Sequence, residues 1–387
     1  MKKTLIAVAA LACAAGVQAQ SNVTLYGVLD HSVGGTSNVI GQNGNAGRQF
    51  ALYPAGGLEG SRWGLRGSED LGAGLSAFFN VESGLNLGNG RFTEDGTLFN
   101  RRALVGLRSQ QFGAISLGRQ SDFVVDFVAP FSQVARYART IGGARFDMNN
   151  FDYSSQMQNS IKYVSPSFSG FHFGAAVSLA GIPGRNRDNI LWSAGAGYDN
   201  GPFKFGLAYT DSKNASFNPF LTNLGRPNSG APTQFQQISG LSDVQTRYRV
   251  GAAGGAYAFG PATIAAAYSY VRNDVNAPGA SIDLKAHIAE ISGTYQLTSA
   301  VGLGLGYTYT RGNAGATTAT QSGRGKFQFH QITAGANYAL SRRTEVYATI
   351  AAQRSGKDNV IGTGINGVGA SNKDTQITGR VGLRHAF

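Results

Sequence analysis

The sequence predicts an all-β protein: a transmembrane antiparallel β-barrel of sixteen strands, with a long third loop folded into the lumen. The first supporting observation is a period-two alternation of apolar and polar residues along most of the chain. In the last segment Ile377, Val381 and Leu383 alternate with residues that include Arg380 and Arg384. A two-residue period places the two kinds of side chain on opposite faces of a strand. Such a strand fits a wall between lipid and water.

Composition is the second observation. Only 14% of the residues are charged, whereas the chain contains 55 Gly, 23 Phe and 16 Tyr. This mixture is unusual for a soluble protein and is typical of a membrane barrel, in which small and aromatic residues alternate with polar ones. Tyrosines near strand ends, such as Tyr26, Tyr209, Tyr307 and Tyr309, suit the interfacial girdle of such a barrel.

The chain begins like an exported protein. Lys2 and Lys3 precede a short apolar run at residues 5–17, and small residues precede a cleavage site after Ala19. We therefore expect residues 1–19 to be a signal peptide. Cys13, the only cysteine, lies inside this segment, so no disulfide is expected in the mature chain. A lipoprotein signal that ends at Cys13 is the alternative, but its leader would be very short.

The remaining residues, 20–387, form one predicted domain, because no linker, charge block or change in composition divides them. The formal net charge of the full sequence is +12. Lys and Arg are spread along the chain without a basic helix, finger spacing or clustered tail, so we expect no nucleic-acid partner. Positive charge that lines a lumen would instead favour anions.

The strands are expected in order along the chain, separated by connections that alternate in length. They span residues 22–34, 61–70, 75–85, 101–110, 114–120, 160–165, 171–180, 191–198, 203–212, 246–259, 262–273, 287–296, 301–311, 327–339, 344–354 and 376–387. The long connections include 36–60, 181–190, 213–245, 313–326 and 355–375. Short turns on one rim and long loops on the other are typical of outer-membrane barrels. An even strand count lets the sheet close and leaves no edge in lipid.

One uncharged run is compatible with a different structure. Residues 251–271 carry no charge and are long enough for a transmembrane helix. However, Gly260 and Pro261 stand near the middle, and residues such as Ile264 and Tyr268 follow a strict two-residue alternation. We therefore expect a hairpin with its turn at Gly260 and Pro261.

Residues 121–159 form a long connection that differs from the others. It combines aromatic residues with charged ones, among them Asp122, Asp126, Arg136, Arg139 and Arg145. Connections of this length are usually functional or disordered, and disordered segments are poor in aromatic residues. We therefore expect a packed loop that folds into the lumen and narrows the wide bore of a sixteen-stranded barrel. The alternative is an external loop that shields the rim.

Several short motifs occur in an order and at spacings that resemble one family. They are VTLYGV at residues 23–28, SRWGLRGSEDLG at 61–72, RRALVGLR at 101–108, FG at 112–113, LGRQ at 117–120 and the terminal Phe387. Together they resemble the general, non-specific porins of Gram-negative outer membranes, of the β-proteobacterial branch, over essentially the whole mature chain. The resemblance implies a passive channel for small hydrophilic solutes and ions in the cell outer membrane.

The same resemblance implies partners and an assembly. Porins of this kind are homotrimers with a separate pore in each subunit, and they contact outer-membrane lipid and lipopolysaccharide. They need no cofactor, and some bind divalent cations at the rim.

The resemblance also implies a set of pore residues. In such porins the inward loop carries acidic residues that face a ladder of arginines. Arg62 and Arg101 match ladder positions, whereas strand parity makes the neighbouring Arg102 the less favoured of the two to point inward. Asp122 and Asp126 match the start of the inward loop.

The sequence departs from the family pattern in the loop and in the first strand. No acidic residue stands at 130–132, where relatives often have one, and Arg136, Arg139 and Arg145 lie nearby instead. Val28 takes a position that is a lysine in some relatives. The loop residues join Arg62, Arg101, Arg102, Asp122 and Asp126 as the expected constriction, whose positive excess predicts a mild preference for anions.

Two other function classes remain as alternatives. A substrate-specific outer-membrane channel, for phosphate or another anion or for a sugar, fits a loop with both arginines and aromatic residues. An outer-membrane hydrolase is the second. The mature chain has five histidines, but it has neither an H-E-x-x-H motif nor a G-x-S-x-G motif. We therefore expect no enzyme activity and no bound metal.

Overall fold

The computed structural model describes residues 22–41, 44–53, 57–94, 96–179, 181, 189–213, 216–224, 244–319 and 322–387. The signal peptide expected at residues 1–19 lies outside these ranges. Among the described residues, no helix has both the length and the apolar character that crossing a membrane requires.

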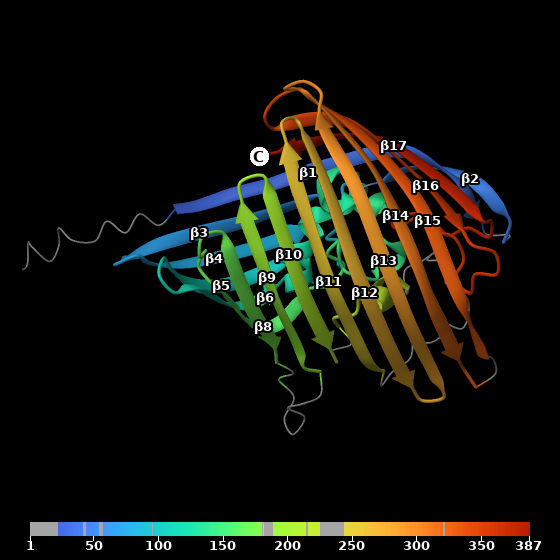
Figure 1. The fold of residues 1–387 in the computed structure, drawn as a ribbon, viewed down its shortest axis with the longest axis horizontal. Helices are drawn as coiled ribbons and strands as arrows, with labels where there is room; N and C mark the ends of the chain where they lie inside the picture. The colour runs from blue at the N-terminus through green and yellow to red at the C-terminus, as the bar shows by residue number, and fades with distance from the viewer. Residues whose placement is uncertain are drawn as a thin grey trace, which may run out of the picture.

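The described chain is mainly antiparallel β-sheet (Figure 1). The strands are β1 (Asn22–Ile40), β2 (Ala46–Tyr53), β3 (Arg62–Gly72), β4 (Leu75–Gly84), β5 (Arg102–Ser109), β6 (Gly113–Gln120), β7 (Met157–Val164), β8 (Phe171–Ser178), β9 (Leu191–Asn200), β10 (Phe203–Ser212), β11 (Gln245–Phe259), β12 (Ala262–Ala277), β13 (Ala280–Gln296), β14 (Val301–Thr317), β15 (Ser322–Ala339), β16 (Thr344–Ser355) and β17 (Thr375–Ala386). The helical turns are η1 (Val124–Val128), η2 (Ala129–Phe131), η3 (Val134–Ala138), α2 (Arg139–Gly142), η4 (Arg145–Asp147) and α3 (Pro219–Leu224).

The sheet closes on itself between the two ends of the chain. On one side β1 pairs with β17, from Val28 opposite Ala386 to Thr36 opposite Thr378. On its other side β1 pairs first with β3 and then with β2. Because β2 and β3 take successive parts of one position in the wall, the barrel has sixteen strand positions, as predicted. Closure leaves no unpaired strand edge in the membrane.

The strands and the turn at residues 260–261 are confirmed, but two loop predictions are wrong. Residues 313–326 are mostly strand, because β14 runs to Thr317 and β15 begins at Ser322. Residues 36–60 contain β2, which pairs with the end of β1. At residues 313–317 the outer face carries Asn313 and Thr317, whereas the inner face carries the buried Ala314 and Ala316, so the apolar-outside alternation of the other strands is absent there.

The two faces of the wall differ in chemistry. On β14, Leu303 and Leu305 are exposed, whereas Gly304 and Gly306 between them are buried. On β15, Ile332 is exposed and its neighbour Thr333 is buried. Exposed apolar side chains at every second position form the face that contacts lipid, and the alternate positions face the lumen.

The segment between β6 and β7 lies inside the barrel, so the predicted inward fold of the third loop is confirmed. Its turn η1 packs on β9, β10 and β11, η2 packs on β11 and β12, and η3 packs on β14 and β15. Figure 1 shows these coils, in teal and green, enclosed by the strands. The connection spans 121–156, since β7 begins at Met157. We call it the inner segment.

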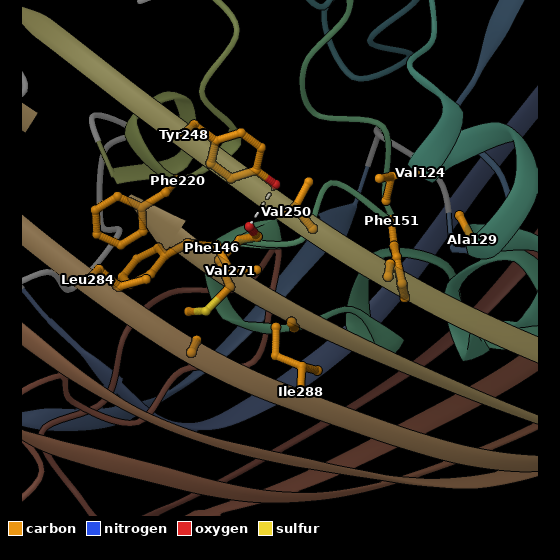
Figure 2. Packing of buried hydrophobic residues seen from close by; sticks show 14 of the residues in the cluster. Val124, Ala129, Phe146, Phe151, Phe220, Tyr248, Val250, Val271, Leu284 and Ile288 are labelled. Carbon is orange, nitrogen blue, oxygen red and sulfur yellow. Dashed lines mark hydrogen bonds between the residues drawn. The ribbon is translucent and has the colours of Figure 1, made fainter. Parts of the chain in front are cut away.

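The hydrophobic core lies between the inner segment and one side of the wall. Phe146 packs edge-on against Phe220 with their ring centroids 5.5 Å apart, and both lie close to wall residues such as Tyr248 and Val271 (Figure 2). The barrel therefore encloses a packed, dry region on this side and leaves the opposite side of the lumen for water.

This core also explains the uncharged run at residues 251–271. Outward positions such as Ile264 and Tyr268 are exposed on the lipid face. Inward positions such as Ala265 and Val271 are buried against the inner segment. Because neither face meets bulk water, a charge would be costly on either of them.

Candidate pore constriction

Glycines on the inner face of the wall allow the inner segment to approach the strands closely. A Cβ atom at Gly206 on β10 would overlap the main-chain carbonyl of Phe127. A Cβ atom at Gly304 on β14 would overlap the ring of Tyr137. These two contacts hold both η1 and η3 against the wall. Glycines in the strands, which we call the glycine bed, therefore provide the space that the inner segment occupies.

Hydrogen bonds from the wall fix the start of the inner segment. The Thr210 hydroxyl donates to the Asp122 carboxylate at 2.8 Å, and the backbone N–H of Phe123 donates to Ser193 Oγ at 3.0 Å. Asp122 is fully buried. Burial raises the pKa of Asp122 to about 6, because the charged form loses its hydration.

A second group of charges lies within the inner segment itself. The Asp147 carboxylate accepts the backbone N–H groups of Asp152, at 2.9 Å, and Ser154, at 3.1 Å. Burial, together with the nearby Asp152, raises the pKa of Asp147 to about 7. Burial lowers the pKa of Arg145 to about 9. Arg139 forms an ion pair with Asp152 at 3.2 Å. These charges hold the segment together.

The opposite wall carries a chain of alternating charges, which we call the charge ladder. In spatial order it consists of Glu345, Arg384, Glu59, Arg62, Glu82 and Arg101. Arg384 lies 3.0 Å from Glu345, and its Nε donates to Glu59 at 2.6 Å. Arg62 lies 3.1 Å from Glu59 and 3.5 Å from Glu82.

Glu82 is also bound by Arg101 at 2.6 Å, so each internal member of the charge ladder touches an opposite charge on both sides. Mutual hydrogen bonding of this kind fixes long side chains that would otherwise sample many rotamers.

The buried carboxylate of Asp30 places Glu59 in the charge ladder. It accepts the backbone N–H groups of Gly57 at 3.1 Å, Leu58 at 2.8 Å and Glu59 at 2.7 Å, and the hydroxyl of Tyr347 at 2.5 Å. The connection before β3 is thereby tied to the inner wall. Burial alone would raise the pKa of Glu59, but the guanidinium groups around it lower the pKa below its usual value.

Arg102 points into the lumen, so the parity prediction for this residue is wrong. It opens β5 opposite Glu82 of β4, and it has the inward parity because Val105 and Leu107 are exposed on the lipid face. The error arises because Arg101 lies just before β5, so the alternation of side chains between the two faces of the strand does not determine its direction. Both arginines therefore reach the lumen.

Arg102 lines a cavity of about 550 Å³ together with Asp126 of the inner segment and Lys162 of β7. Lys162 forms an ion pair with Asp126 and donates to the Ser121 carbonyl at 2.8 Å. Asp126 thus faces the lumen at the edge of the inner segment, with one cation already beside it.

Arg136 lines a second cavity, of about 590 Å³, which also touches Glu59 and Arg384 of the charge ladder. Its guanidinium donates to Thr294 Oγ1 at 2.6 Å. The inner segment therefore places a positive charge, the Arg136 guanidinium, on the same cavity as the charge ladder.

The predicted site residues fall into two groups. Arg62, Arg101, Arg102, Asp126 and Arg136 line the open side of the lumen. The others are Asp122, Arg139 and Arg145, which lie within the packing of the inner segment and have at most a small exposed fraction.

Sequence reasoning missed Glu59, Glu82, Glu345 and Arg384 of the charge ladder. Arg384 had a visible signal, because it stands on the polar face of the last strand. Glu59 had none, since its place depends on the Asp30 carboxylate, which is distant in sequence.

Comparison with known proteins identifies the class of protein to which this barrel belongs. A model of the Gram-negative porin family matches residues 5–358. The chain belongs to the Gram-negative porin family. An outer membrane porin protein of Bordetella pertussis is 37% identical to this porin over 240 residues, which cover 56% of the chain and 61% of that protein. Outer membrane porin protein 32 of Delftia acidovorans is 28% identical, and the match covers all of both chains.

Major outer membrane protein P.IB of Neisseria meningitidis is 30% identical over 215 residues, 54% of the porin and 59% of that protein. The matches thus span about three fifths of the Bordetella and Neisseria relatives. A solved structure, the anion-selective porin from Comamonas acidovorans, shares the fold, with a TM-score of 0.70 at 23% identity over 95% of this chain and 100% of that one. The family and the barrel place this porin in the Gram-negative outer membrane.

Proposed function

We propose that the porin is a passive diffusion channel for small hydrophilic solutes and ions, with a mild preference for anions. The observation that carries this proposal is the excess of positive charge on the open side of the lumen. On the wall there, six arginines face three glutamates: Arg62, Arg66, Arg101, Arg102, Arg108 and Arg384 against Glu59, Glu82 and Glu345. From the inner segment, Arg136 and Asp126 add one charge of each sign and leave this excess unchanged. A surplus of fixed positive charge concentrates anions in the pore.

The surplus lies in three arginines outside the charge ladder. Among the described residues, Arg66, Arg102 and Arg108 have no carboxylate within 4.0 Å, and all three line one cavity of about 430 Å³. Arg66 lies over the ring of Tyr26, and Arg108 lies over the ring of Phe78. Stacking on an aromatic ring holds a guanidinium in place without neutralising it.

The inner segment sets the size limit in this proposal. It covers the inner faces of β9–β15, so solutes pass between Asp126 and Arg136 on one side and the charge ladder on the other. The field across this passage orients dipolar solutes and disfavours apolar ones, which would displace ordered water. Asp122, Arg139 and Arg145 act indirectly, by holding the inner segment in place.

A planar-bilayer measurement in a KCl gradient tests the proposal. We expect the wild-type reversal potential to show anion preference, and the substitution Arg102→Gln to shift it toward cations because it removes an unpaired lumen charge. The substitution Lys285→Gln, which removes a charge from the outer surface, should leave it unchanged. A clear cation preference of the wild type would overturn the proposal.

A substrate-specific anion channel is the second candidate. The three unpaired arginines favour it over a sugar channel, because guanidinium groups bind phosphate in a bidentate fashion. Millimolar inorganic phosphate that blocks the chloride current would support specificity, whereas unchanged current would leave the general channel.

We also propose a homotrimer surrounded by outer-membrane lipid, without enzyme activity. The outer surface of β1 and β17 supports the assembly, since Val23, Leu25, Val381 and Leu383 are all more than half exposed there. Light scattering of the detergent-solubilised protein distinguishes three copies from one.

A further inference from the structure

Two matching clusters of side chains lie on the outer surface of the barrel, and the pore does not use them. In the first, Tyr268 and Tyr270 of β12 lie beside His287 of β13. The Tyr268 hydroxyl is 2.7 Å from His287 Nδ1, and the Tyr270 ring centroid is 4.8 Å from that of His287. On the other side of His287, the strand register places Arg311 of β14 directly opposite it.

The second cluster repeats the first, two strands further along the sheet. Tyr307 and Tyr309 of β14 lie beside His330 of β15, with the Tyr307 hydroxyl 2.6 Å from His330 Nδ1. The ring centroids of Tyr309 and His330 are 5.1 Å apart. Arg354 of β16 lies opposite His330 in the register. Both clusters thus present tyrosine, histidine and arginine in the same order across three strands.

Both clusters point away from the lumen. Tyr268 is 45% exposed, whereas the next residue along β12, Ser269, is buried. Likewise Ile288 and Gln331, which follow the two histidines, are buried on the inner face. The clusters therefore face the membrane, at a height where tyrosine rings typically mark the boundary between acyl chains and headgroups.

Basic residues without acidic partners surround the two clusters. Among the described residues, Lys285, Arg311, Lys326 and Arg354 have no carboxylate within 4.0 Å, and they lie on the four consecutive strands β13 to β16. Lys285 and Lys326 both lie opposite Asn313 of β14, so they flank the same position.

Other arginines on this outer surface have carboxylate partners. Arg249 and Arg272 both pair with Asp274, and Arg324 pairs with Asp283. The positive charges around the clusters are thus the ones that lack a carboxylate partner within the protein. A charge next to lipid is costly unless a counter-ion binds to it.

The clusters belong to the half of the barrel near the outer rim. Lys285 follows the tight turn after β12, and Lys326 follows the start of β15, both on the rim that also carries the long connection before β11. Long connections face the cell exterior in barrels of this kind. The counter-ion must therefore come from the outer leaflet.

We propose that the two clusters bind the phosphate groups of lipopolysaccharide in the outer leaflet. Arginine binds phosphate through two parallel N–H groups, and the lysines add charge beside it. When the Tyr268 hydroxyl donates to Nδ1, the His287 ring carries its proton on Nε2, which makes that nitrogen a further donor. In the second cluster His330 Nε2 lies 2.7 Å from the Gln328 side-chain amide, so the basic residues alone are available to phosphate there. The proposal deepens the lipid contact proposed above, and it does not depend on how the pore selects ions.

Titration of the purified, delipidated protein with bisphosphorylated lipid A tests this proposal, with binding followed by native mass spectrometry. We expect lipid A to bind at least tenfold more tightly than the same lipid without phosphates. The double substitution Arg311→Gln with Arg354→Gln should abolish this difference. The substitution of both arginines by Lys, which keeps the charge and loses the bidentate geometry, should restore part of it.

The double substitution Arg342→Gln with Arg343→Gln is the matched control, because it removes the same charge at the exposed turn before β16 and should leave lipid A binding intact. Equal binding of the two lipids, or equal binding by the Arg311 and Arg354 variant, would overturn the proposal. Binding of inorganic phosphate alone with the same dependence on Arg311 and Arg354 would also overturn it, in favour of a free-anion site. The variant should keep the wild-type reversal potential, which separates this result from the pore proposal.

Discussion

Three charged residues of the inner segment are buried inside the barrel: Asp122, Arg145 and Asp147. Burial raises the pKa of both aspartates, to about 6 and about 7, and lowers the pKa of Arg145 to about 9. Carboxylates that lose water on folding are held better in the protonated form. The docking of the inner segment therefore depends on pH.

We predict that the inner segment is bound more firmly at pH 5 than at pH 8. The pKa of Asp147 is about 7 in the fold against an ordinary value of 3.8, so the folded state binds more protons between these values. Stability then falls as pH rises through this window. Hydrogen exchange of residues 121–156, corrected for the intrinsic rate, should be faster at pH 8.

The substitution Asp147→Asn should flatten this pH dependence. The substitution Asp70→Asn, at an exposed position beside a short turn, should preserve it. Equal corrected exchange rates at both pH values in the wild type would contradict the assignment.

Single residues of the site were predictable only where a motif or a strand pattern contained them. Arg62 and Arg101 were found through a family motif, and Arg384 was visible on the polar face of the last strand. The orientation of Arg102 was missed, because parity depends on where the strand begins. The place of Glu59 could not be predicted from the sequence, since the Asp30 carboxylate that positions it comes from β1.

At the scale of elements, the inner segment and its glycine bed form one unit. We predict that Gly206→Ala displaces η1, because the added methyl group would overlap the Phe127 carbonyl. Overpacking of this kind costs about 1–3 kcal/mol. Single-channel conductance should rise and the thermal unfolding midpoint should fall.

The substitution Gly293→Ala is the control, since no atom lies within 4 Å of the added Cβ there. If Gly206→Ala kept the wild-type conductance and stability, the close contact between η1 and β10 would be refuted.

Most elements followed from the alternation pattern, because lipid and lumen impose opposite demands on neighbouring residues. The pattern failed where those demands end. Residues 313–326 resembled a loop because their exposed positions are polar and their inward positions small, as at Ala314 and Ala316, but the described part of this stretch forms strands. Residues 251–271 lost their charges because the inner segment covers the inner face.

At the scale of the whole molecule, the barrel depends on one seam between its first and last strands. Gly27 and the terminal Phe387 exchange two backbone hydrogen bonds, at 3.1 Å and 3.0 Å. A Cβ atom at Gly27 would overlap the Phe387 ring and come within 2.7 Å of the Arg62 carbonyl.

We predict that Gly27→Ala weakens the seam by about 1–3 kcal/mol through this overlap. Thermal unfolding in detergent, followed by circular dichroism, should show a lower midpoint. The substitution Gly47→Ala on β2, where no atom lies within 4 Å of the added Cβ, should leave it unchanged. An unaltered midpoint for Gly27→Ala would show that the seam tolerates a side chain.

The dry region between the inner segment and β11–β13 constrains how this barrel is assembled. If those strands paired before the inner segment was in place, Val250, Val271 and Leu284 would expose an apolar surface to water in the lumen. The inner segment comes before them in the chain, so it is made first and is available as a scaffold. We therefore expect the inner segment to be in place before these strands close around it.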